Sequence, residues 1–277
     1  MPARRFHLVD VFSEEALGGN PLAVVHDAGG LPDGDLHRFA RWVNLSETTF
    51  VLPPTDPRAD YRVRILSPTG ELPFAGHPTL GSAHAWLEAG GVPQRPDVVV
   101  QQCGAGLAEV RRRGERLAFA APPLLREGPV DQELVDHLVR VLGADPASVR
   151  DARWLDNGPG WVALLLDSAE SVLALRPGPV DLDVGVVGPH TPGSADAVEV
   201  RAFFPVRGAT VEDPVTGSLN AALAGWLAKR GYAVPPYTAR QGTVLGRSGR
   251  VHLDIDAAGT VWAGGATRTV ATGSTTL

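Results

Sequence analysis

Apolar and polar residues alternate along several short segments of this chain, as they do in β-strands with one buried face. The clearest case is Tyr61–Leu66, while Leu36–Val43 and Gln132–Leu142 show the spacing of amphipathic helices. Segments rich in β-branched and aromatic residues predict further strands at Phe6–Phe12, Leu22–Val25, Ser46–Leu52, Trp161–Leu166, Val198–Pro205, Val251–Ile255 and Val261–Val270. Because short strands outnumber helices in both halves, we predict an α+β fold and not a regular βαβ alternation.

Two further predicted helices differ from ordinary surface helices. The first ends in Trp86-Leu87 and the second in Trp226-Leu227, and both carry alanine, glycine, serine and leucine on most faces. A helix that is apolar nearly all round is usually buried. Since small side chains let strands approach closely, we expect a helix enclosed by a curved sheet in each half of the chain.

The same short pattern, Pro-x-x-Gly-Ser, precedes both helices, at Pro78–Ser82 and at Pro214–Ser218. His77 stands directly before the first proline and Asp213 directly before the second, and either side chain can move a proton or hold a substrate. Because proline favours the first helical position, the helices are expected to begin near these prolines. The repetition predicts a duplicated fold with two similar helix starts at a shared cleft.

A proline-rich segment, Ala120–Val130, is the best candidate for a linker. The chain has 277 residues, which is long enough for two domains of ordinary size. We therefore expect an N-terminal lobe of residues 1–119 and a C-terminal lobe of residues 120–277.

Charge and composition narrow the functional classes. The net charge of −6, without a basic run that interleaves aromatic residues, disfavours a nucleic acid partner. No segment approaches the ~20 apolar residues of a membrane helix, and the N-terminus does not resemble a secretory signal. The single cysteine, Cys103, cannot form an internal disulfide, which fits a cytoplasmic location.

Several motifs occur together and in a consistent order: Asp10–Val25, Asn44–Val51, Glu71–Ser82, Glu212–Ser218 and Arg240–Arg247. Together they closely resemble the PhzF family, the phenazine-biosynthesis-type isomerases, over nearly the whole chain. The resemblance implies a fold like that of diaminopimelate epimerase. In that fold two similar lobes each wrap a barrel-like sheet around a central helix, and the active site lies between them.

The resemblance also implies a homodimer and proton transfer without a cofactor or a metal. The characterised reaction of the family is the isomerisation of trans-2,3-dihydro-3-hydroxyanthranilate. The last strand, near Val261–Val270 or beyond, is expected to return to the first lobe.

Three residues match the family's catalytic positions, although each also has an ordinary structural interpretation. Glu47 matches the catalytic acid/base, and its β-rich, apolar surroundings would disfavour the charged form; the alternative is a strand-surface or helix-flanking glutamate. His77 is assigned to the active site, and the alternative is a capping or core histidine. Asp213 occupies the corresponding place in the second half, and the alternative is an N-cap.

Four further residues are candidates for substrate binding. Backbone amides at the two helix starts, around Gly76, Gly217 and Ser218, are suited to bind and polarise an anionic substrate. Asn20 lies in a Gly-Asn-Pro turn and either lines the cleft or serves the turn alone.

Other kinds of chemistry find little support. Related epimerases use a pair of cysteines, which this chain does not have, and no histidine shows metal-ligand spacing of the His-Glu-x-x-His type. The leading hypothesis is a cofactor-independent isomerase that acts on a small carboxylate-bearing substrate. The alternative is a non-catalytic binding protein that retains the cleft, against which the presence of Glu47, His77 and Asp213 argues.

Overall fold

The computed structural model describes residues 3–114 and 116–277. The chain forms two compact units, and each is considered by itself. The first contains residues up to Ala120 together with Gly264–Leu277, and the second contains Ala121–Ala263. No helix in the described ranges is long and apolar enough to cross a membrane.

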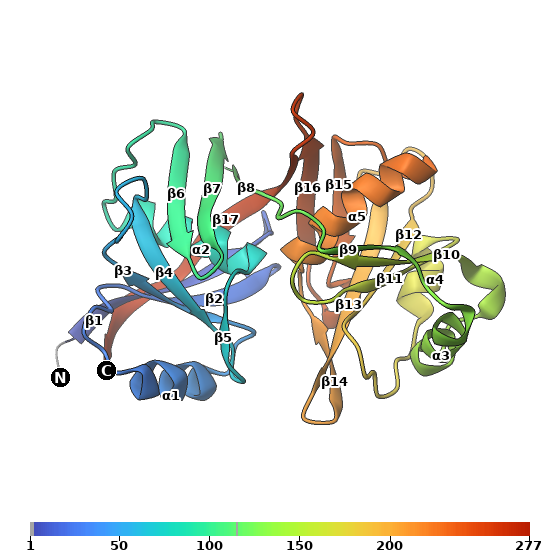
Figure 1. Ribbon diagram of the computed structural model, residues 1–277, viewed down its shortest axis with the longest axis horizontal. Coiled ribbons are helices and arrows are strands. Elements are labelled where there is room, and N and C mark those ends of the chain that lie inside the picture. Colours follow the sequence, from blue (N-terminus) through green and yellow to red (C-terminus); the bar gives the residue numbers. More distant parts are fainter. Residues whose placement is uncertain (1–2, 115) are drawn as a thin grey trace. The chain divides into compact units, whose positions relative to one another are not determined.

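The first unit is a closed barrel of eight strands (Figure 1). The strands pair in the order β1, β2, β3, β4, β6, β7, β8 and β17, and β17 closes the ring by pairing with β1 as well as β8. Their bounds are Ala3–Val11, Asn20–Val25, Thr48–Leu52, Tyr61–Leu66, Val98–Cys103, Gly106–Arg113, Arg116–Ala120 and Val261–Thr276. The short strand β5 (Glu71–Leu72) pairs with β4.

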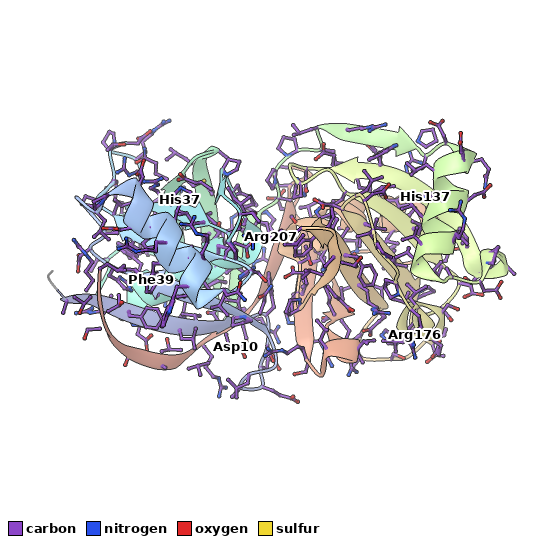
Figure 2. The ribbon with its side chains drawn as sticks, turned by 90° about the horizontal axis from the view of Figure 1, so that it is seen from below. Asp10, His37, Phe39, His137, Arg176 and Arg207 are labelled. Atoms are coloured by element: carbon purple, nitrogen blue, oxygen red, sulfur yellow. The ribbon has the colours of Figure 1, made fainter. Side chains whose placement is uncertain are left out.

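Helix α2 (Gly76–Glu88) occupies the inside of this barrel, where it contacts β1, β2, β3, β6, β7 and β8. Most of its residues are buried. A Cβ atom at Gly81 would approach the Leu22 side chain to 2.6 Å, so the barrel closes only around small residues. Helix α1 (Asp33–Val43) lies outside and buries Leu36 and Phe39 (Figure 2) against a cluster that includes Phe50.

The second unit repeats this pairing scheme. Here β10, β11, β12, β13, β15 and β16 pair in order, with β9 beside β10 and β14 beside β13. The bounds of β9 to β16 are Arg126–Pro129, Val149–Asp156, Val162–Leu166, Val184–Pro189, Val198–Val206, Ala209–Asp213, Tyr237–Gln241 and Gly249–Ile255. The long central helix is α5 (Gly217–Arg230), and a Cβ atom at Gly185 would approach Leu219 of this helix to 2.4 Å.

The internal duplication is visible in the order of parallel and antiparallel pairs. In the first unit β2–β3 and β4–β6 are parallel, and α1 and α2 lie within these crossovers. In the second unit β11–β12 and β13–β15 are parallel, and the crossovers contain α4 (Ala169–Ala174) and α5. Helix α3 (Gln132–Leu142) packs with α4 on one apolar cluster and has no counterpart among the described residues of the first unit. The predicted α+β fold of two similar lobes is confirmed.

The central helices begin near Pro78 and Pro214, as predicted, but at different places relative to these prolines. Helix α2 begins at Gly76, two residues before Pro78, whereas α5 begins at Gly217, three residues after Pro214. Pro78 therefore lies in the first turn, where an absent N–H removes no intrahelical hydrogen bond. Asp213 ends β14 and is not the N-cap, which is Thr216.

Hydrogen bonds identify the segments that correspond in the two units. The Thr79 hydroxyl donates to the carbonyl of the N-cap Ala75 at 2.8 Å. The Asn220 amide likewise donates to the carbonyl of the N-cap Thr216 at 2.9 Å. Aligned on these caps, Leu72–His77 corresponds to Asp213–Ser218, and both segments contain Pro-x-x-Gly. The true repeat thus begins at Pro73, so that His77 corresponds to Ser218 and Asp213 to Leu72.

Candidate active site

Glu47 lies between the end of α1 and the start of β3. The chain leaves α1 through Asn44, whose left-handed conformation (φ 56°) ends the helix, and enters β3 at Thr48. The Glu47 side chain is 17% exposed, whereas Thr48 and Thr49 behind it are fully buried. The Glu47 side chain is thus partly exposed, while its Oε2 atom is buried.

His77 is the second residue of α2 and is buried. Its Nε2 atom lies 3.4 Å from Oε2 of Glu47, slightly longer than a formed N–H···O hydrogen bond. Burial lowers the pKa of His77 to about 3, so the imidazole is neutral near pH 7. The contact therefore joins a carboxyl group to a neutral ring and is not an ion pair at that pH.

The start of α2 also provides backbone donors beside His77. The first intrahelical bond runs from Thr79 N to Ala75 O, so the amides of Gly76 and His77 have no acceptor within the helix. Such amides, together with the helix dipole, favour an anionic group. The first unit thus combines a carboxyl, a neutral imidazole and a helix N-terminus.

Asn20 is the first residue of β2 and is fully buried. The turn before it is fixed because Gly19 N donates to Oδ1 of Asp10 at 2.9 Å, and a Cβ atom at Gly19 would meet Val11 O at 2.1 Å. Strand β2 runs parallel to β3, into which Glu47 leads. Asn20 and Glu47 consequently lie towards the same ends of neighbouring strands.

The second unit brings Asp213 close to the start of α5. Asp213 is 8% exposed, and its Oδ2 atom accepts a hydrogen bond of 2.7 Å from the Thr216 hydroxyl. Gly217 and Ser218 are the first two residues of α5. Asp213, Gly217 and Ser218 are therefore neighbours, as the motif Asp-Pro-x-x-Gly-Ser requires.

Two residues beside Ser218 were not among the sequence-based candidates. The Asn157 amide donates to Ser218 O at 2.9 Å, and Trp161 Nε1 donates to Ser218 Oγ at 3.2 Å. Both come from the connection between β10 and β11, about sixty residues earlier. Only Trp161 gave a sequence signal, as the start of a buried strand, and that signal did not indicate a site.

Two other kinds of site, a metal site and a reactive cysteine, find little support in the described residues. Over residues 3–114 and 116–277, no group of three or more histidine, cysteine, aspartate or glutamate side chains is arranged to hold a metal ion. Cys103 is partly buried, and burial raises the pKa of its thiol. A thiol held in its protonated form is a poor nucleophile and a poor base.

Comparison with known proteins places this chain within one family. Residues 9–276 match the family model PhzC-PhzF, described as phenazine biosynthesis-like protein. Trans-2,3-dihydro-3-hydroxyanthranilate isomerase of Pseudomonas aeruginosa is 34% identical, with 92% of this chain and 91% of that protein covered. Antisense-enhancing sequence 1 of Schizosaccharomyces pombe is 33% identical, with 99% of both chains covered.

Solved structures agree with this relationship. A PhzF family protein of Enterococcus faecalis has a TM-score of 0.80 at 26% identity, with all of both chains covered. A hydroxyproline epimerase of Agrobacterium vitis has a TM-score of 0.58 at 16% identity, with 99% of this chain and 93% of that one covered, a likeness of fold alone. The chain belongs to the PhzC-PhzF family, and it is an isomerase of that family.

Proposed function

We propose that this protein is a cofactor-independent isomerase that moves a proton within a small carboxylate-bearing substrate, with Glu47 as the acid/base. The observation that carries the proposal is the approach of His77 Nε2 to Glu47 Oε2 at 3.4 Å, in the first turn of a buried helix. A pure binding protein has no need of a carboxyl group paired with a buried neutral imidazole.

In this mechanism the Glu47 carboxylate takes a proton from an acidic carbon and returns it to another position of the same π-system. A neutral His77 suits this role, because a cationic ring would stabilise the carboxylate and weaken it as a base. The ring can still donate or accept one hydrogen bond as Glu47 changes its charge. A single base returns the proton on the face from which it was removed.

Substrate binding is assigned to the helix starts. The amides near Gly76 are suited to a carboxylate, and so are those of Gly217 and Ser218. Asp213 is proposed to hydrogen-bond the same substrate, and Asn20 to help bind it. A crystal structure with bound substrate analogue tests this assignment, since contacts confined to Glu47 and His77 would remove Asp213 from the site.

The first compound to try is trans-2,3-dihydro-3-hydroxyanthranilate, because the 34%-identical relative is named as the isomerase of this compound. Wild-type protein incubated with it in deuterated water should form the isomer with deuterium at the reprotonated carbon. Glu47→Gln keeps the size of the side chain but cannot exchange a proton, so it should bind the compound and incorporate no label. Binding without isomerisation or labelling by the wild type would instead support the non-catalytic alternative for this compound.

The proposal also covers the location, assembly and partners of the enzyme. We propose that it is a homodimer in the cytoplasm and that it binds neither nucleic acid nor membranes. Sedimentation of the purified protein tests the dimer, because a monomer at micromolar concentration would contradict it. Fractionation of cells that express the untagged chain tests the location.

A further inference from the structure

A buried glutamine of the second unit, Gln241 at the end of β15, holds the start of α5 and the Asp213 carboxylate in one network. Its side chain makes four hydrogen bonds. Oε1 accepts from Thr216 N at 3.0 Å and from Asn220 Nδ2 at 2.8 Å. Nε2 donates to Asp213 O at 3.1 Å and to Thr216 Oγ1 at 2.9 Å.

The direction of every bond in this network is fixed by backbone groups. A backbone N–H can only donate, so the amide oxygen of Gln241 must face Thr216 N. A backbone carbonyl can only accept, so the amide nitrogen must face Asp213 O. Its second proton goes to Thr216 Oγ1, which leaves the hydroxyl proton of Thr216 for Asp213 Oδ2 at 2.7 Å.

The backbone around this network is equally constrained. Gly242 has φ +89°, and a Cβ atom there would approach Pro214 O to 2.6 Å. A Cβ atom at Gly249 would approach the Val215 side chain to 2.3 Å. The turn between Asp213 and Gly217 is thus packed against β15 and β16, with Gln241 at the centre of the contact.

We propose that Gln241 is a positioning residue, which fixes the Asp213 carboxylate and the first amides of α5 through Thr216. The inference rests on the proposed function, since Asp213 must serve the reaction for its orientation to matter. Gln241 itself is fully buried and all its donors and acceptors are used within the protein, so it acts through its neighbours and not on the substrate.

The first unit contains a related arrangement. Gln101 lies in β6, the counterpart of β15, and is equally buried. Its Nε2 donates to Thr79 Oγ1 at 2.9 Å, and its Oε1 accepts from the Tyr61 hydroxyl at 2.8 Å. The Thr79 hydroxyl in turn donates to Ala75 O, the N-cap carbonyl of α2. Gln101 therefore supports the start of α2 as Gln241 supports the start of α5, and Gln101→Ala is not a control for stability alone.

The test is a double-mutant cycle on turnover of trans-2,3-dihydro-3-hydroxyanthranilate, with variants Gln241→Ala, Thr216→Val and their combination. Each single variant should lower kcat by about 10²-fold, because small misplacements of substrate-contacting groups have effects of that size. The kcat of the double variant should be no lower than that of the more impaired single variant, since both changes break the same chain of hydrogen bonds. Thr216→Ser keeps the hydroxyl and should recover most of kcat.

Thr210→Val provides the comparison for loss of stability alone, because the Thr210 hydroxyl donates to Gly178 O at 2.7 Å and accepts from Val180 N at 2.8 Å, away from both helix starts. It should lower the urea midpoint with a much smaller effect on kcat than Gln241→Ala at temperatures where both are folded. Multiplying effects in the double variant, or an equal loss of kcat in Thr210→Val, would overturn the inference while leaving the proposed function intact.

An inactive wild type would instead defeat the proposed function for this compound. In that case the urea unfolding midpoints of the same variants are compared. A double variant whose midpoint shift is smaller than the sum of the two single shifts upholds the link between Gln241 and Thr216, and a shift equal to that sum overturns it.

Discussion

The starts of α2 and α5 are held by similar hydrogen bonds but carry different functional side chains. Each follows a Pro-x-x-Gly segment, each bonds a side chain back to the N-cap carbonyl, and each is tied to a glutamine on the corresponding strand. The residue after the glycine is His77 in one unit and Ser218 in the other. The residue before the proline is Leu72 in one and Asp213 in the other. The two units thus share the backbone of the helix start and the buried hydrogen bonds that hold it, but they differ in the side chains that can move a proton or hold a substrate.

The largest expected effect on turnover is that of removing the proposed acid/base, Glu47 of the first unit. Glu47→Gln should reduce kcat by about 10²–10⁴-fold, the usual contribution of a general acid/base, with little change in substrate affinity. Turnover of trans-2,3-dihydro-3-hydroxyanthranilate in deuterated water, with circular dichroism as the folding control, provides the measurement. Label that enters equally fast in the variant would move the acid/base role towards Asp213.

Asp213→Asn should have a smaller effect that appears in both kcat and KM. Asparagine can still accept a hydrogen bond from Thr216, but it loses the charge. We expect a loss of about 10-fold to 10²-fold in kcat/KM, the cost of weakening one or two charge-assisted hydrogen bonds. A pure loss of kcat as large as that of Glu47→Gln would mean that the second unit also moves the proton.

The two units can also be compared by acid titration. Burial lowers the pKa of His77 to about 3 and of His26 to about 4, from an ordinary value of 6.5. Between these values and pH 6.5 the unfolded chain binds more protons than the folded one, so stability is full above pH 6.5 and falls as the pH drops.

We therefore expect the first unit to lose on the order of a few kcal/mol of stability between pH 6.5 and pH 4. Urea unfolding followed by hydrogen exchange at several pH values measures this loss for each unit. His77→Asn should flatten the pH dependence. An unchanged slope in this variant would show that the imidazole is not held neutral by the fold.

Glycine substitutions sharpen the comparison of the two central helices. Gly81→Ala should cost about 1–3 kcal/mol, because its Cβ would press on Leu22 and Val11 inside the barrel. Gly225→Ala in α5 meets nothing within 4 Å and should gain about 0.5–1 kcal/mol from better helix propensity. Thermal unfolding of both variants provides the test, and equal costs would mean that the two helices are enclosed alike at these positions.

The smallest expected effect concerns the thiol. Cys103→Ala should leave turnover within about two-fold of the wild type, in the range of ordinary conservative substitutions outside a site. Treatment with a chelator should likewise have no effect on turnover. Loss of activity on either treatment would place the reaction in another chemical class.

Local patterns predicted much of the fold, because strand alternation and small-residue helices are properties of neighbouring residues. The segment Gln132–Leu142 forms α3 with those bounds, and Tyr61–Leu66 forms β4. The two helix starts were aligned wrongly because Pro78–Ser82 imitates Pro214–Ser218, whereas the proline that corresponds to Pro214 is Pro73. Sequence spacing could not distinguish these two prolines, since both Pro73 and Pro78 stand three residues before a glycine, and only the cap hydrogen bonds of Thr79 and Asn220 show which one corresponds to Pro214.

The candidate site shows the same limit. Glu47 and His77 were named from their motifs, and their approach to 3.4 Å depends on β3 and α2 belonging to one barrel. Gln241 lies within the Arg240–Arg247 motif, which gave it no role, and Asn157 and Trp161 gave no signal of a site. Each reaches α5 only through strand pairing and crossovers, so its role is set by tertiary structure.

The long strand β17 gives the first barrel an unusual folding problem. It pairs with β1 from Ala3↔Thr276 onward, so the ring joins segments from opposite ends of the sequence, with the whole second unit between them. Contacts of such long range form slowly. During synthesis β1 and β8 expose unpaired edges that favour misassociation until β17 emerges. The second unit, by contrast, is continuous in sequence and can fold first, while the unit that holds Glu47 and His77 must wait for the last residues of β17.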